Sequence, residues 1–184
     1  MERIGHNRFK PELCASCGQT TEYPIRLDKG TAYIVIAIAN AVRLKNKNRV
    51  HLRNEMLVKR GEYPSTRDVA IAGKMTATMI DNVLRAKYHG LVAQIDGGGT
   101  GEYLLTPKGA RFLRGEAVPA LAAIDKTKHV KKYYIDEETD WTTIGRILRG
   151  DTNFWDHAWD IDENTLSLKR RAVATREKTE APLL

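Results

Sequence analysis

The residues best suited to chemistry are two cysteines, Cys14 and Cys17, separated by Ala15 and Ser16. Thiolates at this spacing form half of the ligand shell of a structural zinc ion, which takes four ligands. The chain has no third cysteine, so a complete site needs two of the five histidines or a second copy of the chain. A vestigial knuckle or free thiols is the favoured alternative. Zn²⁺ at Cys14 and Cys17 is the one candidate cofactor that the sequence offers.

Other patterns of catalytic residues are missing from the sequence. A C-x-x-C redox motif normally begins a helix in a thioredoxin-like unit, and the sequence around Cys14 does not predict one. The glycine run from Gly97 to Gly101 lacks the Lys-Ser/Thr that follows in a phosphate-binding loop. The acids between Asp136 and Glu163 have no recognisable metal-ligand spacing, and acidic clusters are usually solvated faces. We expect a binding protein rather than an enzyme.

Charge is distributed unevenly along the 184 residues. The chain has a net charge of +7, but the segment from Tyr134 to Asn164 holds nine acids and two arginines, so the remainder carries +14. A basic body favours nucleic acid as the partner. The longest apolar run, Ala32 to Ala39, is too short to span a bilayer, and the N-terminus lacks the apolar stretch of a secretory signal. We expect a cytoplasmic protein with no membrane partner.

Helices and strands are predicted from apolar spacing, caps and glycines. We expect a loop-rich start, and then helices at 31–44 (capped by Asp28), 50–59, 65–72 and 76–89. Strands are predicted at 91–95 and 102–105 around a glycine-rich loop, followed by a helix that begins at Thr106-Pro107 and ends before Gly115. Residues 120–124 are expected to extend this closing helix, residues 133–135 to form a strand, and residues 167–184 to form a frayed basic helix or a disordered tail.

The order of these elements resembles a winged helix-turn-helix domain of the broad MarR-like kind. The residues that carry the resemblance lie between Thr66 and Arg114, and the most specific are Gly90-Leu91-Val92 and the run from Leu105 to Gly109. Gly90 lets the second helix of the turn lead into a strand, and Gly109 allows close packing. The resemblance implies an α+β fold in which this second helix enters the DNA major groove.

A wider set of residues resembles small bacteriophage helix-turn-helix proteins with an N-terminal C-x-x-C knuckle. The set comprises Cys14, Cys17, Gly18, Leu105, Thr106, Gly109, Phe112, Leu113, Gly115, Val118 and Pro119. This resemblance implies a viral or mobile-element origin and lends no settled activity.

The exposed face of the helix at 76–89 supplies candidate DNA contacts. Arg85 can pair with guanine and Asn82 with adenine through two hydrogen bonds each, while neighbouring Lys, Arg and Thr side chains hold phosphates. The candidate DNA-binding residues are Arg49, Arg53, Arg67, Lys74, Thr76, Thr78, Asn82 and Arg85. Taken singly, each is more often an ordinary solvated side chain. As a set, they predict a sequence-specific double-stranded DNA-binding protein, a transcriptional regulator of a phage or mobile element.

Two features of the sequence favour a different class of function. The expected wing tip, Asp96 to Glu102, has no Lys or Arg, and Asp81 would repel phosphates. The alternative is a phage-encoded inhibitor that binds a host protein, such as a defence nuclease (an anti-CRISPR) or a polymerase. Its anchors would be the aromatic residues of the acidic segment, Trp141, Phe154, Trp155 and Trp159. These tryptophans can instead pack onto the winged domain as part of its core.

The sequence therefore divides into four parts. We expect a C-x-x-C knuckle or loop at 1–27, a winged helix-turn-helix domain at 28–124, an acidic Trp-rich extension at 125–166 and a basic tail at 167–184. The expected partners are double-stranded DNA and, as further candidates, a second copy in a homodimer or a host protein.

Overall fold

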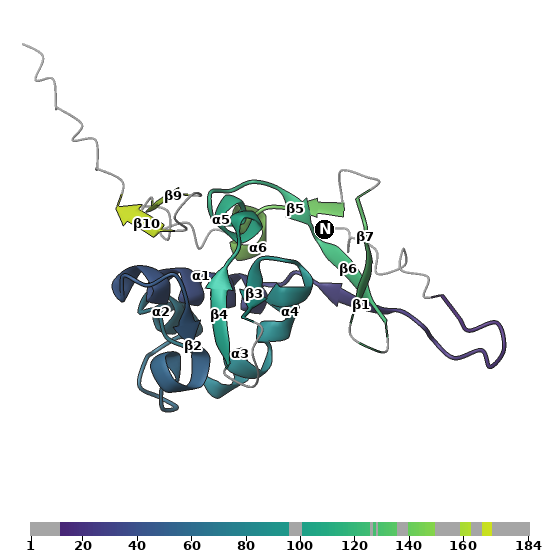
Figure 1. Ribbon diagram of the computed structural model, residues 1–184, viewed down its shortest axis with the longest axis horizontal. Helices are drawn as coiled ribbons and strands as arrows, with labels where there is room; N and C mark the ends of the chain where they lie inside the picture. The colour runs from purple at the N-terminus through teal and green to yellow at the C-terminus, as the bar shows by residue number, and fades with distance from the viewer. Residues whose placement is uncertain are drawn as a thin grey trace, which may run out of the picture.

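The computed structural model describes residues 12–95, 101–125, 127, 129–135 and 140–149, and the backbone of strands at 159–162 and 167–170. These residues form an α+β fold of short helices and small antiparallel sheets around one long helix, α1 (Lys29–Leu44) (Figure 1). The α+β class predicted from the sequence is confirmed. Among the described residues, no helix combines the length and the apolar character needed to cross a membrane.

Helix α1 is the centre of the hydrophobic core. Asp28 caps it as predicted, because its Oδ1 accepts hydrogen bonds from both the backbone N–H and the hydroxyl of Thr31, each at 2.7 Å. Every residue from Thr31 to Val42 is buried, so α1 is covered on all sides. The one buried amide on this stretch, Asn40, donates from Nδ2 to the carbonyl of Ala70 at 3.2 Å.

The next helices are α2 (Thr66–Ile71), α3 (Ala77–Asp81) and α4 (Val83–Tyr88). Ser65 caps α2, and its hydroxyl accepts from the N–H of Asp68. The single helix expected at 76–89 is divided at Asn82, which has φ −95° and ψ 2°. There the backbone N–H of Asn82 is shared between the carbonyls of Thr78 and Met79, and that of Arg85 donates to the carbonyl of Asn82, three residues back rather than four.

The turn between α2 and α3 lies directly against the backbone of α1. Gly73 has φ +66°, and a Cβ at this position would lie 2.7 Å from the backbone nitrogen of Ala41. Only glycine satisfies both the backbone conformation and this close approach. Gly109 has a similar role in the helix α5 (Pro107–Leu113), where a Cβ would meet the carbonyl oxygen of Leu91. The close packing predicted for Gly109 is confirmed.

A three-stranded antiparallel sheet has the order β2-β4-β3. The hairpin of β3 (Val92–Gln94) and β4 (Glu102–Leu105) was predicted, and its connecting residues 96–100 lie outside the described residues. The third strand, β2 (Val50–His51), corrects the helix expected at 50–59. Val50 pairs with Tyr103, and only a single wide helical turn, η1 (Leu52–Met56), follows. Leu57 then bridges to Met75 in extended geometry, so sheet pairing outcompetes the helix.

A second three-stranded sheet joins distant parts of the chain in the order β1-β6-β7. Its strands are β1 (Tyr23–Arg26), β6 (Leu121–Ile124) and β7 (Val130–Tyr133). The expectation that 120–124 extends the closing helix is therefore wrong, because Ala122 and Ala123 are buried in ladders with both neighbouring strands. The predicted strand at 133–135 is displaced, and only Tyr133 belongs to β7.

The remaining elements are short. Strand β5 (Val118–Pro119) pairs with β8 (Trp141–Thr142), and helix α6 (Ile144–Leu148) places Ile144 and Leu148 in the core beside α1. Strand β9 (Trp159–Asp162) pairs with β10 (Ser167–Arg170). The strand β10 replaces the start of the helix or disordered tail expected at 167–184. The rest of that tail lies outside the described residues.

Candidate nucleic-acid interface

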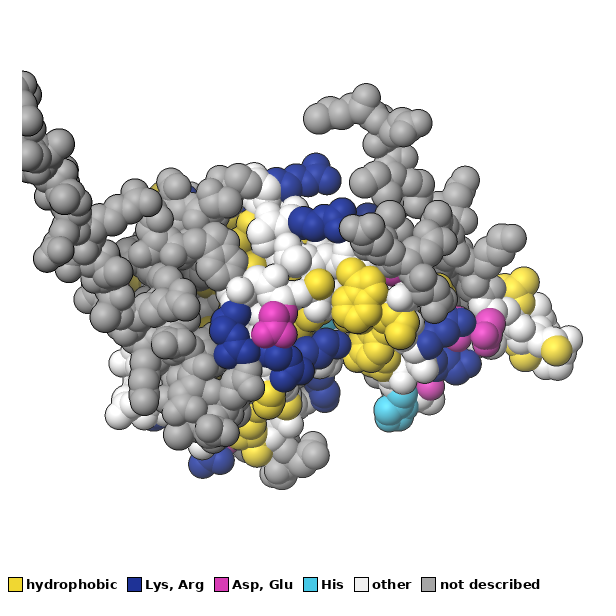
Figure 2. Space-filling model, turned by 90° about the horizontal axis from the view of Figure 1, so that it is seen from above, with side chains coloured by type: hydrophobic (Ala, Val, Ile, Leu, Met, Phe, Trp, Pro, Cys, Tyr) yellow, Lys and Arg dark blue, Asp and Glu magenta, His cyan; other side chains and the backbone are white. Residues whose placement is uncertain are grey.

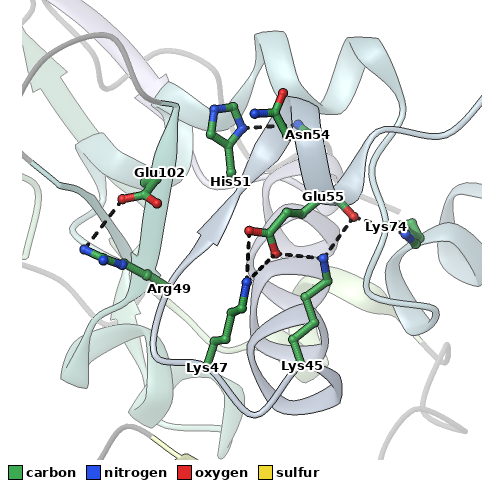
Figure 3. A network of polar contacts seen from close by, with 8 residues as sticks. All are labelled: Lys45, Lys47, Arg49, His51, Asn54, Glu55, Lys74 and Glu102. Carbon is green, nitrogen blue, oxygen red and sulfur yellow. Dashed lines mark hydrogen bonds and ion pairs between the residues drawn. The ribbon is translucent and has the colours of Figure 1, made fainter.

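Three lysines converge on Glu55, the carboxylate in η1 (Figure 3). The Nζ of Lys45 lies 2.7 Å from Glu55 Oε2, and the Nζ of Lys47 lies 3.4 Å from Oε1. Lys74, from the turn before α3, donates to the backbone carbonyl of Glu55 at 3.1 Å. The hydrogen bond from Lys45 is the main reason that the pKa of Glu55 is lowered, with Lys47 adding to it. Glu55 thus stays ionised and holds these cations at one place.

Two arginines flank this cluster, each beside an acid of a neighbouring element. Arg49 Nη1 lies 3.6 Å from Glu102 Oε2 on β4, and Arg53 Nη2 lies 3.5 Å from Asp81 Oδ1 on α3. The side chains of Arg49 and Arg53 are 55% and 65% exposed. Pairs this exposed contribute about 0–1 kcal/mol, so the arginines can exchange a carboxylate for another anion at little cost.

We call Lys45, Lys47, Arg49, Arg53 and Lys74 the basic cluster. Its five cations face the three acids Glu55, Asp81 and Glu102, so the surface keeps a positive balance. The cations come from the loop after α1, from η1 and from the turn before α3. Segments far apart in sequence therefore build one cationic surface, which is the arrangement that phosphate binding needs.

The start of α3 lies beside the basic cluster. Thr76 caps the helix, with its hydroxyl oxygen accepting from the N–H of Met79 at 3.3 Å, while Met79 and Ile80 point into the core. Thr78 and Asp81 are exposed, and Arg53 joins this face to the cluster through Asp81. Asp81 was expected to repel phosphates, and its pairing with Arg53 offsets part of that repulsion.

Two of the residues predicted to read bases have partners within the chain. The Nη1 of Arg85 lies 2.8 Å from Asp28 Oδ2, the carboxylate that caps α1. Asn82 donates from Nδ2 to the carbonyl of Thr78 at 2.8 Å, across the break between α3 and α4. Arg67 lies half-buried in the first turn of α2. The structure thus brings Arg49, Arg53 and Lys74 together, and sets Arg85 against α1.

The eight residues named from the sequence as DNA-binding candidates do not include Lys45, Lys47 or Glu55, although the basic stretch 43–60 as a whole is expected to contact phosphates. The signal that could have found them is that Glu55 is the only acid between Arg43 and Arg60, amid seven basic residues. A lone acid in a basic stretch must lie close to several cations if the stretch folds back on itself.

The two cysteines lie on an exposed hairpin whose strands are linked at Leu13 and Thr20. Cys14 Sγ lies 3.0 Å from the Ser16 hydroxyl, and the backbone N–H groups of Ser16 and Cys17 also face it. These hydrogen bonds, the Ser16 hydroxyl first, lower the pKa of Cys14 to about 6. Among the described residues, no group of three His, Cys, Asp or Glu side chains is arranged to hold a metal ion.

Of the aromatic residues expected to anchor a host protein, only Trp141 has a described side chain. Trp141 is 36% exposed and donates from Nε1 to the carbonyl of Ile135 at 3.2 Å. Ile135 is itself 51% exposed. Phe154 and Trp155 lie outside the described residues, and Trp159 is described only as backbone in β9. The face seen in Figure 2 carries an apolar cluster with Lys and Arg side chains on either side.

Comparison with known proteins found no matching family model, no matching curated protein and no matching solved structure. The function therefore has to be argued from the geometry of the chain itself.

Proposed function

We propose that the chain is a double-stranded DNA-binding protein built on a winged helix-turn-helix. The order α1, β2, α2, α3–α4, β3, β4 is the order of elements in such a domain, and the strand order β2-β4-β3 suits a wing formed by the β3–β4 hairpin. The tight turn at Gly73, which packs on α1, supports assigning α2 and α3 as the two helices of the turn.

The observation that carries this proposal is the basic cluster beside the exposed start of α3. Lys45, Lys47, Arg49, Arg53 and Lys74 would contact phosphates on either side of the groove that α3 enters. Thr78 would reach base edges, and Asp81 would accept from a cytosine amine once Arg53 has moved to a phosphate. Arg85 would add a guanine contact only by leaving Asp28.

The biological role that fits is a regulator of a phage or mobile element, acting on DNA inside the host cell and carrying out no chemistry. Helix-turn-helix regulators commonly bind as homodimers to two half-sites about one helical turn apart. Sedimentation of the protein with and without a selected DNA site would show whether this chain pairs in the same way.

The proposal is tested by fluorescence anisotropy with mixed-sequence duplex DNA over a salt series. The double variant Lys47→Glu/Arg49→Glu should lose at least tenfold in affinity and show a shallower salt slope, because phosphate contacts release counterions. The matched control is Arg111→Glu/Arg114→Glu on α5, which changes the charge equally. α5 lies on the opposite side of α1 from α3 in Figure 1. Equal losses in both variants would mean that only net charge matters, and would overturn the proposed interface.

A second candidate function is favoured by one observation, the exposed pair Trp141 and Ile135. We propose as the runner-up that this surface anchors a host protein, with the fold as a rigid scaffold. Under this proposal Trp141→Ala would abolish capture of that protein and leave DNA affinity unchanged. Loss of DNA affinity in Trp141→Ala, with folding intact, would contradict it.

A further inference from the structure

The hairpin that holds the two cysteines has no part in the proposed DNA interface. The backbone N–H of Cys14 donates to the carbonyl of Gln19 and that of Gly18 donates to the carbonyl of Cys14, both at 2.8 Å. Gly18 takes φ +68°, with open space where a Cβ would lie. These bonds close a tight turn over residues 14–19, in which Cys14 is partly exposed and Cys17 is exposed.

The groups around Cys14 are hydrogen-bond donors. The Ser16 hydroxyl lies 3.0 Å from Cys14 Sγ, and the backbone N–H groups of Ser16 and Cys17 face the same sulfur. The Cys17 side chain also faces Cys14, and Cys17 is exposed to solvent. A turn that places two cysteine side chains facing each other near the surface, with amides directed at the first, suits a thiophilic ion.

The hairpin is also tied to the rest of the fold. Thr21 donates from both its backbone N–H and its hydroxyl to the carbonyl of Glu12, at 2.8 Å each. Glu12 Oε1 lies 3.3 Å from Lys132 Nζ on β7, and Lys132 also lies 3.0 Å from Glu22, which is buried. The turn thus has a fixed base and an exposed tip, so a metal at the tip would not require the fold to rearrange.

We propose that Cys14 and Cys17 form a zinc half-site, in which two thiolates of this turn bind one Zn²⁺ and its remaining positions stay open to further donors. Zinc is chosen because thiolate sulfur is among its preferred ligands and because two ligands at this spacing match half of a tetrahedral shell. The site is independent of the basic cluster and of DNA binding.

The experiment uses the full-length reduced protein, stripped with a chelator and titrated with Co²⁺ and then with Zn²⁺. We expect thiolate-to-cobalt charge-transfer absorption that Zn²⁺ abolishes, and a loss of at least tenfold in Zn²⁺ affinity in Cys14→Ser and in Cys17→Ser. The matched control Ser16→Ala keeps both thiols and should retain the charge-transfer band, with weaker binding. Alkylation by iodoacetamide in the absence of metal would confirm that both thiols are present and reactive.

The readout is optical, so it is independent of DNA affinity, and failure of one proposal leaves the other standing. Unchanged Zn²⁺ affinity in both serine variants would overturn the half-site. A reduced wild-type protein that shows no thiolate-to-cobalt absorption would overturn it as well.

Discussion

Arg85 Nη1 on α4 lies 2.8 Å from Oδ2 of Asp28, the residue that caps α1. The pair joins the second half of the expected reading helix to the start of the central helix, across 57 positions in sequence. A residue predicted to read a base is therefore engaged within the fold. Burial raises the pKa of Asp28, but the hydrogen bonds from the N–H and hydroxyl of Thr31, with a further contribution from Arg85, hold that pKa below its usual value.

Asp28 and Arg85 can be separated by mutation. Asp28→Asn keeps a side-chain oxygen for the cap and removes the ion pair, whereas Asp28→Ala removes both. We expect Asp28→Ala to cost about 1 kcal/mol of unfolding free energy, and both Asp28→Asn and Arg85→Ala to cost well under that amount, because the pair is nearly half exposed. Urea unfolding measures all three. If Arg85→Ala loses more unfolding free energy than Asp28→Ala, then the helix cap is not the main contribution of Asp28 to stability.

Gly73 should tolerate no side chain. Gly73→Ala places a Cβ 2.7 Å from the backbone of α1 at a positive φ, and we expect a loss of about 2–4 kcal/mol of unfolding free energy. Gly61 is the matched control, since its φ is +84° with nothing within 4 Å of a Cβ. Gly61→Ala should cost only about 1 kcal/mol. Equal losses in urea unfolding would show that the contact with α1 contributes nothing beyond backbone strain.

His89 predicts a pH dependence of stability. It is 1% exposed, and the carbonyls of Ile25 and Pro119 face its ring without well-aligned hydrogen bonds. Burial, with a smaller effect of Lys108, lowers the pKa of His89 to about 4 from 6.5. Between these values the unfolded chain binds a proton that the folded chain does not. The unfolding free energy therefore falls as the pH drops from about 6.5 to about 4, by on the order of 3 kcal/mol.

The measurement is urea unfolding at several pH values in the wild type and in His89→Met. Protonation of carboxylates such as Glu55 also lowers the unfolding free energy in acid, so the variant is needed to isolate the contribution of the histidine. Between pH 6.5 and 4, the unfolding free energy of His89→Met should change less with pH than that of the wild type. His129→Gln, at an exposed position, should follow the wild type. A direct NMR titration of His89 gives the pKa even if His89→Met folds poorly, and a value near 6.5 would refute the prediction.

Under the proposed function, Glu55 should weaken DNA binding. Its carboxylate offsets one charge of the basic cluster, so Glu55→Gln should raise affinity for duplex DNA by about two- to fivefold. The control is Glu116→Gln on the α5 side, which removes an acid that faces Arg111 and Arg114 and should leave affinity unchanged. A fall in affinity in Glu55→Gln with folding intact would mean that Glu55 positions Lys45 and Lys47 for phosphate contact.

Local signals in the sequence were sufficient to predict the helices and the hairpin whose ends are set by nearby residues. Asp28 and Thr106 cap helices where predicted, because a cap needs only a side-chain oxygen three residues before an N–H. Gly90, at φ +69°, ends α4 for a similarly local reason. The β3–β4 hairpin follows from two short apolar runs around a glycine-rich loop.

Where a segment pairs with residues far away in the sequence, its secondary structure depends on the tertiary structure. Leu121–Ile124 has a composition that suits a helix, yet it is a strand because β1, nearly a hundred residues earlier, and β7 pair with both of its edges. Val50–His51 is extended because Tyr103 and Glu102 offer backbone partners. The convergence of Lys45, Lys47 and Lys74 on Glu55 has the same origin. Pairings between distant residues depend on which surfaces the core brings together, and a local pattern does not carry that information.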